Sequence, residues 1–141
     1  MASGVTVDDR CLQVFQELKL KKAFSYIVYK LSDDYTTIEV EKLAEADEDV
    51  TYDDFVDNLP ESDCRYAIYD MHYQKSAQEG MRSKICFFSW SPDSARIKHK
   101  MLYASSKDAL RKRLMGVGTE IQGTDMDEIS FETVMQRICS V

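Results

Sequence analysis

The segment Ile85-Cys86-Phe87-Phe88 is apolar at four consecutive positions. A strand with one solvated face alternates apolar and polar residues, whereas a strand covered on both faces is continuously apolar. This segment therefore predicts a central β-strand in a sheet that is covered on both sides. A chain of 141 residues, of which 44% are hydrophobic, is long enough to build such a core within one domain.

The order of the other periodic segments completes the predicted fold. In chain order we expect a helix capped by Thr6 or Asp8, strands at 24–31 and 36–43, a helix at 51–58, strands at 64–71 and 84–90, a helix within 96–113, a strand at 117–121 and a helix starting near Ser130. The long helix before the strand at 117–121 allows that strand to pair parallel to another through a right-handed crossover. The predicted class is α+β, a mixed five- or six-stranded sheet flanked by helices on both faces. Residues 1–141 are expected to form a single domain with a short mobile arm at 1–6.

Three of the predicted helices carry apolar side chains at helical spacing, which predicts the face that each helix buries. The stripes are Cys11, Val14, Phe15 and Leu18 in the first helix; Ile97, Met101, Ala104, Ala109, Leu110 and Leu114 in the helix within 96–113; and Phe131, Val134, Met135 and Ile138 in the last helix. For the middle helix, Asp93 or Ser94 is the expected N-terminal cap and Gly116 the expected end.

The helix within 96–113 also concentrates positive charge. Seven of the chain's eighteen Lys and Arg residues lie in these eighteen positions, and Asp108 is the only acid among them, so the segment has a net charge of +6. The rest of the chain, with 24 acidic and 11 basic residues, has a net charge of −13. A solvated helix face usually mixes both signs, because opposite charges four positions apart stabilise it. Two interpretations stay open: the solvated face of a core-packed helix, or a surface that binds an acidic partner.

The usual catalytic and metal-binding motifs are missing. The sequence contains no G-x-S-x-G, H-E-x-x-H, P-loop or G-x-G-x-x-G pattern and only two histidines. Its four cysteines are widely separated among apolar neighbours, which predicts buried free thiols rather than zinc ligands or disulfides. With no apolar run near twenty residues and no signal peptide, we expect a cytosolic protein that is not an enzyme and uses no metal ion or cofactor.

Several blocks of sequence resemble the actin-depolymerising factor/cofilin family and occur in its order. They are Leu59-Pro60-Glu61, Asp63-Cys64-Arg65-Tyr66-Ala67-Ile68-Tyr69-Asp70, Arg82-Ser83-Lys84-Ile85, Trp90-Ser91-Pro92-Asp93, Lys100-Met101-Leu102-Tyr103-Ala104-Ser105-Ser106-Lys107-Asp108 and Gly123-Thr124-Asp125. The resemblance extends from Ser3-Gly4-Val5 to the last helix. It implies a single actin-depolymerising-factor homology domain that binds actin monomers and filament sides, prefers the ADP form, and severs and depolymerises filaments.

The resemblance also implies two binding surfaces on the domain. The surface for monomers and filaments comprises Ser3, Gly4, Val5, Lys98, Lys100, Met101, Ser106, Arg111 and Lys112. The surface for filaments alone comprises Arg82, Lys84, Gln136 and Arg137, and Gln136 stands where many relatives carry an acid. The resemblance also makes Ser3 a candidate phosphorylation site, where a phosphate would repel acidic actin.

Other partners fit parts of the same charge pattern. The alternative function is a phosphoinositide-binding peripheral regulator that uses the basic helix through Lys98, Lys100, Lys107, Arg111 and Lys112. Nucleic-acid binding requires aromatic residues interleaved with the cations, and Tyr103 alone does not supply them, so no nucleic-acid partner is expected. We expect a monomer in the cytoplasm and the cytoskeleton. The lysine-rich nuclear-targeting insertion of vertebrate family members is absent, which leaves nuclear entry open.

Overall fold

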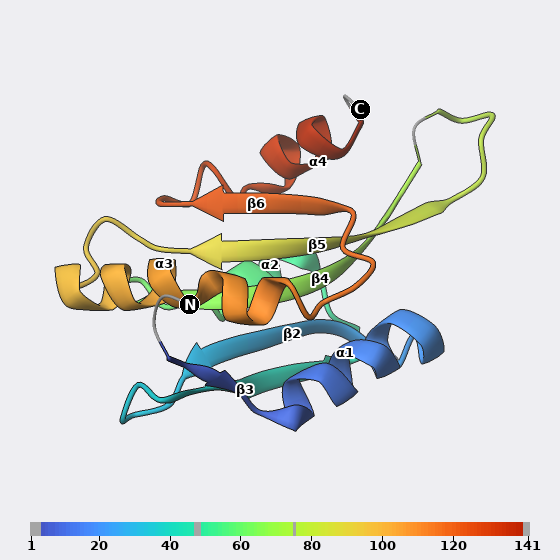
Figure 1. Cartoon of the computed structure of the whole chain (residues 1–141). Helices are drawn as coiled ribbons and strands as arrows, with labels where there is room; N and C mark the ends of the chain where they lie inside the picture. Colours follow the sequence, from blue (N-terminus) through green and yellow to red (C-terminus); the bar gives the residue numbers. More distant parts are fainter. Residues whose placement is uncertain (1–3, 47–48, 75, 140–141) are drawn as a thin grey trace.

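The computed structural model describes residues 4–46, 49–74 and 76–139, and these contain one six-stranded sheet and four helices (Figure 1). The elements in chain order are β1 (Thr6–Val7), α1 (Asp9–Lys21), β2 (Phe24–Leu31), β3 (Thr37–Glu45), α2 (Tyr52–Asp57), β4 (Arg65–Tyr73), β5 (Arg82–Trp90), α3 (Ile97–Arg111), β6 (Thr119–Gly123) and α4 (Phe131–Cys139). The strands lie in the order β1-β3-β2-β4-β5-β6. This mixed sheet flanked by helices confirms the predicted fold class.

Two antiparallel hairpins form the middle of the sheet, and a parallel strand closes each edge. β2 pairs antiparallel with β3 and with β4, and β4 pairs antiparallel with β5. At the edges, β1 runs parallel to β3, and β6 runs parallel to β5. The crossover from β5 to β6 contains α3, as the long helical segment between these strands predicts.

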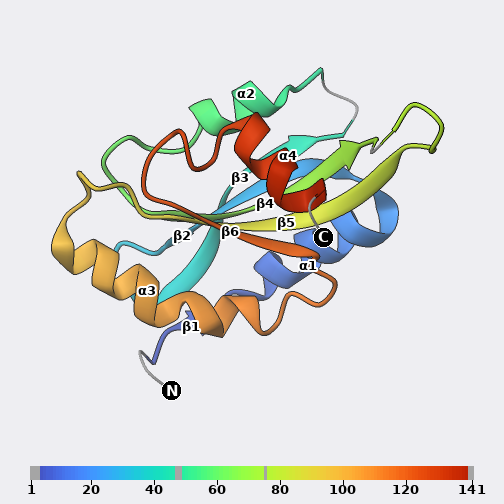
Figure 2. The same cartoon turned by 90° about the horizontal axis from the view of Figure 1, so that it is seen from above.

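The sheet separates two hydrophobic cores (Figure 2). On one face α1 and α3 pack against the strands, with Phe15, Leu18 and Leu110 fully buried. On the other face α2 and α4 cover an aromatic cluster that includes Phe55. The predicted inward stripe of α1 is buried at all four positions, because residues three and four apart share one side of a helix.

β5, like β2 and β4, contributes side chains to both cores. Ile85 and Phe87 face the core under α1 and α3, whereas Cys86 and Phe88 face the core under α2 and α4. The continuous apolar segment is therefore covered on both sides, as predicted. β5 lies one strand in from the edge, between β4 and β6.

The N-terminal predictions hold only in part. Asp8 caps α1, since its Oδ1 accepts a hydrogen bond from the backbone N–H of Arg10 at 3.1 Å. Thr6 does not cap the helix, and it is not part of a free arm, because Thr6–Val7 pairs with Thr37 and Ile38 as β1. A two-residue strand lacks an alternating pattern long enough to be detected in the sequence.

The start and end of α3 also differ from the prediction. The segment before it forms a tight turn, in which the N–H of Ala95 donates to the carbonyl of Pro92, and Ser94 Oγ donates to the carbonyl of Glu61. The N-cap position is therefore Arg96, which makes no side-chain cap. The helix ends at Arg111, before Gly116, and the latter adopts a φ of 102° in the turn that follows.

Two smaller differences concern the last third of the chain. β6 begins at Thr119 rather than at residue 117, in register with Cys86 on β5. In α4, Val134 and Ile138 are buried and Met135 is half-buried, but Phe131 is 45% exposed, contrary to its predicted inward position. Phe131 occupies the first turn of α4, where its ring packs against the edge of Tyr52 instead of entering the core.

None of the described helices has a long enough apolar stretch to cross a lipid bilayer.

Candidate protein-binding surface

Two tyrosines hold α3 against the sheet. The backbone N–H of Leu31 donates to the hydroxyl of Tyr103 at 2.9 Å, and the hydroxyl of Tyr66 donates to the carbonyl of Tyr103. The rings of Tyr66 and Tyr103 lie 5.1 Å apart. Both hydroxyl groups are buried and paired, so these contacts define which side of α3 faces inward.

The resulting rotation of α3 exposes the residues that the sequence pattern assigned to its buried stripe. Ile97 is 74% exposed and Met101 is 67% exposed, and Ala104 is exposed as well. The inward residues are Tyr103, Ser106 and Leu110. The predicted stripe is therefore wrong in its first half, because a helix with two apolar stripes has two possible orientations and the tyrosine contacts select one.

His99 ties the first turn of α3 to two neighbouring loops. Its Nδ1 lies 3.1 Å from Asp63 Oδ1, and its Nε2 lies 2.8 Å from the hydroxyl of Tyr35. Burial raises the pKa of the Asp63 carboxyl, but the hydrogen bonds from Arg65 and from the Cys64 N–H outweigh it and leave the pKa below its usual value. The start of α3 is thereby held in place by both loops.

The cations of α3 divide into two groups. Lys107 Nζ and Arg111 Nε lie 3.2 and 3.1 Å from the two carboxylate oxygens of Glu120 on β6. Burial raises the pKa of Glu120, but the hydrogen bond and charge of Lys107 and the charge of Arg111 lower it by more, so the carboxyl stays ionised. Part of the predicted positive charge is therefore neutralised within the protein.

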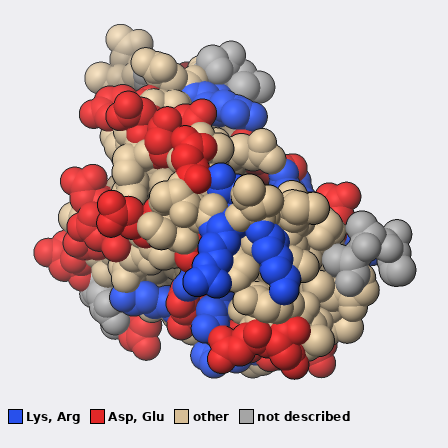
Figure 3. All heavy atoms as spheres, turned by 90° about the vertical axis from the view of Figure 1, so that its left-hand side faces the viewer, with Lys and Arg blue, Asp and Glu red and all other residues tan. Residues whose placement is uncertain are grey.

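The second group lies toward the start of the helix. Lys98 is exposed, with its ammonium 5.7 Å from the centre of the Tyr35 ring. Lys100 is half-buried and donates to the carbonyl of Asp93 at 2.8 Å. Beyond the helix, Lys112 is exposed. Figure 3 shows the side of the molecule at which α3 begins. Lys and Arg side chains lie near the centre of this face, and Asp and Glu side chains lie around them.

Ser106 does not lie on the exposed face of α3. Its exposed fraction is 0%, and its hydroxyl has no hydrogen-bond partner in the described structure. A side chain with no exposed surface cannot contact a partner directly unless the helix moves, so the burial of Ser106 does not support its expected direct contact, which stays a prediction. Ser106 instead fills space between the helix and the sheet.

The N-terminal strand lies beside α3. β1 packs next to this helix, as Figures 1 and 2 show. Gly4 is exposed, with a φ of 70°, whereas Val5 is half-buried against the core under α1 and α3. Ser3 lies outside the described residues. Gly4 is thus exposed in the N-terminal segment, and exposed Ile97, Lys98 and Met101 give the start of α3 both apolar and cationic character.

The four residues predicted to contact filaments alone come from two other elements. Arg82 and Lys84 lie at the start of β5; Arg82 is exposed and pairs with Glu79 at 2.9 Å. The Lys84 stem covers Gly118, where an added Cβ would lie 2.6 Å from Lys84 Cγ. Gln136 and Arg137 are exposed on α4.

The four cysteines are free thiols, and none is fully exposed. Cys11, Cys64 and Cys86 are buried free thiols, as predicted, and Cys139 is half-buried. Burial raises the pKa of Cys11 and of Cys86 to about 12, so both thiols stay protonated at neutral pH. Within residues 4–46, 49–74 and 76–139, no three His, Cys, Asp or Glu side chains are grouped closely enough to hold a metal ion.

The exposed apolar residue Ile97 is the part of this surface that the sequence interpretation missed. A signal for it is present, because Tyr103, Ser106, Leu110 and Leu114 follow helical spacing and place Ile97 and Met101 on the other side. The competing stripe through Ile97 contains larger apolar residues at its start. Periodicity alone does not decide which of the two stripes faces the core.

Comparisons with known proteins agree with this fold. The sequence model for cofilin/tropomyosin-type actin-binding proteins matches residues 4–139. Cofilin of Mycosarcoma maydis is 55% identical over 138 residues, covering 98% of this chain and 96% of that protein. Cofilin of Saccharomyces cerevisiae is 51% identical over 136 residues, covering 96% of this chain and 93% of that protein.

Solved structures show the same similarity. Streptomyces griseoflavus cofilin superimposes with a TM-score of 0.87 and 47% identity, covering 95% of this chain and 96% of the other. Plasmodium berghei actin depolymerization factor 2 superimposes with a TM-score of 0.84 and 34% identity over 100% of both chains. With a sequence match that spans both cores and the basic helix, this chain belongs to the cofilin/actin-depolymerising-factor family of actin-binding proteins.

Proposed function

We propose that this protein binds actin monomers and the sides of actin filaments, prefers the ADP form, and severs and depolymerises filaments. The observation that carries the proposal is the exposed pair Ile97 and Met101 beside Lys98, on a helix that two tyrosines hold in a defined orientation. Large apolar side chains on a surface mark interaction sites when they are grouped. Family membership supports actin as the partner.

The proposed monomer-and-filament surface uses the start of α3 together with the N-terminal segment. Ile97 and Met101 supply apolar contact, and methionine adapts to an irregular partner surface. Lys98 and Lys100 supply positive charge toward acidic actin, which favours encounter and orientation. We assign Gly4, Val5 and, from its position in the sequence alone, Ser3 to the same surface. Arg111, the last residue of α3, and Lys112, just after it, extend the surface.

The mechanism requires no covalent chemistry. A ligand that binds one filament conformation better than another shifts the filament toward that conformation. Severing then follows where a stretch of altered filament meets an unaltered one.

A filament-pelleting assay tests the function: the protein should appear in the pellet with filaments and stay in the supernatant without them, and filament length should fall.

The filament-only surface gives a separate prediction. Replacing Arg82 and Lys84 with Ala should weaken filament binding on the order of tenfold, because two cations facing an acidic partner are lost. Monomer binding should persist, since neither residue lies on α3. Co-sedimentation and a monomer titration measure the two activities. The matched control is Arg10→Ala with Lys21→Ala on α1, which removes the same charge. An equal loss of monomer and filament binding by the β5 variant would contradict a two-surface arrangement.

Phosphorylation of Ser3 is proposed as an inhibitory switch. A phosphate adds roughly −1.5 to −2 charge at neutral pH, beside a surface that meets acidic actin. Ser3→Asp should therefore weaken monomer binding about tenfold or more, whereas Ser3→Ala should bind as the unmodified protein does. A monomer titration with both variants and with enzymatically phosphorylated protein measures this. Unchanged affinity of the phosphorylated protein would remove Ser3 as a switch.

Phosphoinositide binding is the second candidate function for the basic helix. The ion pairs of Lys107 and Arg111 with Glu120 speak against it, because two of the five proposed phosphoinositide cations are thereby paired within the protein. Of the five, Lys98, Lys100 and Lys112 have no carboxylate partner among the described residues. A liposome-pelleting assay with and without phosphoinositide tests this candidate function.

We propose that the protein is located in the cytoplasm and the actin cytoskeleton, that it is monomeric, and that it has no nucleic-acid partner.

A further inference from the structure

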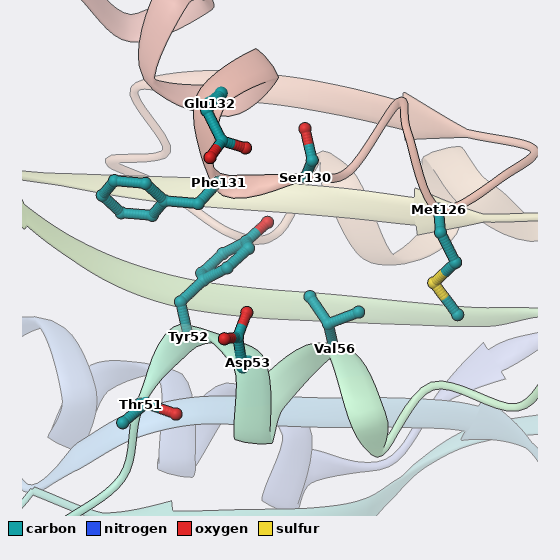
Figure 4. A pocket seen from close by; sticks show the side chains of 8 residues that line it. All are labelled: Thr51, Tyr52, Asp53, Val56, Met126, Ser130, Phe131 and Glu132. Atoms are coloured by element: carbon teal, nitrogen blue, oxygen red, sulfur yellow. The ribbon is translucent and has the colours of Figure 1, made fainter.

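A groove lies between α2 and the start of α4 (Figure 4). Both helices lie on the face of the sheet opposite α3 (Figure 2). Its volume is about 460 Å³, within the range of small binding pockets. The apolar lining is supplied by Val56, Met126 and Phe131, and Tyr52 lies between the two walls. Two of these side chains are unusually open, since Met126 and Phe131 are each 45% exposed.

The shape of the groove is set by well-held groups. The hydroxyl of Tyr52 donates to the carbonyl of Ile129 at 2.6 Å, which joins α2 to the segment before α4. The rings of Tyr52 and Phe131 lie 5.7 Å apart at 66°, an edge-on arrangement. Ser130 Oγ accepts from the N–H of Thr133 at 3.3 Å, which caps the first turn of α4. Phe131 is therefore presented at the groove by a fixed helix start.

The walls of the groove are acidic. Residues 51–61 and 124–135 contain eight acidic residues and no Lys, Arg or His. These are Asp53, Asp54, Asp57, Glu61, Asp125, Asp127, Glu128 and Glu132. Asp53 and Glu132 belong to the lining itself. In the described part of the chain, no salt bridge involves any of the eight. The cation Lys42 donates a hydrogen bond to Asn58 Oδ1 just after α2, but neither residue belongs to the groove lining.

This chemistry selects one kind of occupant. An apolar floor between uncompensated carboxylates suits a segment with a large apolar side chain flanked by Lys or Arg, and such cations also interact favourably with the faces of aromatic rings. Nucleic acid and anionic lipid are repelled by the same carboxylates. We propose that the groove between α2 and α4 docks a cationic, apolar-anchored peptide segment of a second partner protein while α3 remains free to bind actin.

The test uses a designed peptide as the probe. A twelve-residue amidated peptide with two leucines four positions apart among lysines and alanines is titrated into ¹⁵N-labelled protein, and amide shifts are recorded. The peptide with every lysine replaced by glutamate is the matched control. We expect shifts concentrated in residues 51–57 and 124–133, and none with the glutamate peptide. Shifts centred on α3, or spread over the molecule, would overturn the proposal.

Substitutions distinguish binding in the groove from attraction by the net charge of the protein. Phe131→Ala should weaken peptide binding about tenfold, because a central apolar anchor is lost. Asp53→Asn with Glu132→Gln should weaken it about fivefold at low salt and less at high salt. Asp33→Asn with Glu45→Gln removes the same charge elsewhere and should leave binding unchanged. Equal weakening by this control variant would mean that only net charge matters.

A competition experiment distinguishes the groove from the actin surface. With actin monomers at saturation, the lysine peptide should still bind with the same affinity, measured by fluorescence anisotropy of a labelled peptide. Loss of peptide binding in the presence of actin would overturn the idea of a second partner. If the protein does not bind actin at all, the peptide titration alone still decides the groove, so failure of the proposed function and failure of this inference are distinguishable.

Discussion

Lys98→Glu together with Lys100→Glu should abolish binding to both actin monomers and filaments while the domain stays folded. Lys98 is exposed, and Lys100 makes a single hydrogen bond to a backbone carbonyl, so the reversal should cost folding less than about 1 kcal/mol per residue. Across an interface with an acidic partner, the same reversal juxtaposes like charges and costs several kcal/mol, on the order of a hundredfold or more in affinity. Co-sedimentation and a monomer titration measure the loss.

Two controls make this result specific. Arg10→Glu with Lys21→Glu changes the net charge equally on α1 and should bind normally. Ser106→Ala changes a buried residue of α3 and should also bind normally, without loss of stability, because its hydroxyl has no hydrogen-bond partner to lose. Full co-sedimentation by a folded Lys98→Glu, Lys100→Glu protein would refute the proposed surface. Weak binding by Ser106→Ala would show that the helix moves on binding.

Phe55→Ala should lower the free energy of unfolding by about 3–5 kcal/mol, the usual cost of removing a fully buried aromatic side chain. Phe55 has an exposed fraction of 0%, and its ring lies 5.0 to 5.2 Å from the rings of Tyr26, Tyr69 and Phe88. It attaches the short helix α2 to the sheet, and a six-residue helix has little stability of its own. Thermal unfolding should show a decrease in Tm on the order of 10 °C.

The control for this substitution is its neighbour. Val56 is only half-buried, so Val56→Ala should cost about 1 kcal/mol. Below its unfolding temperature, Phe55→Ala should still bind actin, because α3 packs on the other face of the sheet. A loss of stability equal to that of Val56→Ala would mean that α2 is held by contacts other than the aromatic cluster.

The strand and helix pattern of the sequence determined most of the architecture. The apolar segment at 85–88 requires cover on both faces, and β5 has it. The order of the elements and the crossover before β6 follow from chain connectivity. The sequence blocks also determined the family, because matches in order over the whole chain depend on residue identity and not on conformation. The two-residue β1 was not predicted, since it forms only by pairing with β3, whose partner residues lie 31 positions later in the chain.

Only the tertiary structure decided which residues are presented to a partner. Periodicity assigned Ile97 and Met101 to the core, and the structure exposes both. The family resemblance placed Ser106 on the binding surface, and the structure buries it. The reason is that the rotation of a helix is set by contacts with other elements, here Tyr66 and the Leu31 backbone. In the same way, the sequence shows seven Lys and Arg residues at 96–113 but not which of them form ion pairs within the protein. Glu120 on β6 pairs with Lys107 and Arg111, so the unpaired positive charge of α3 lies at its start.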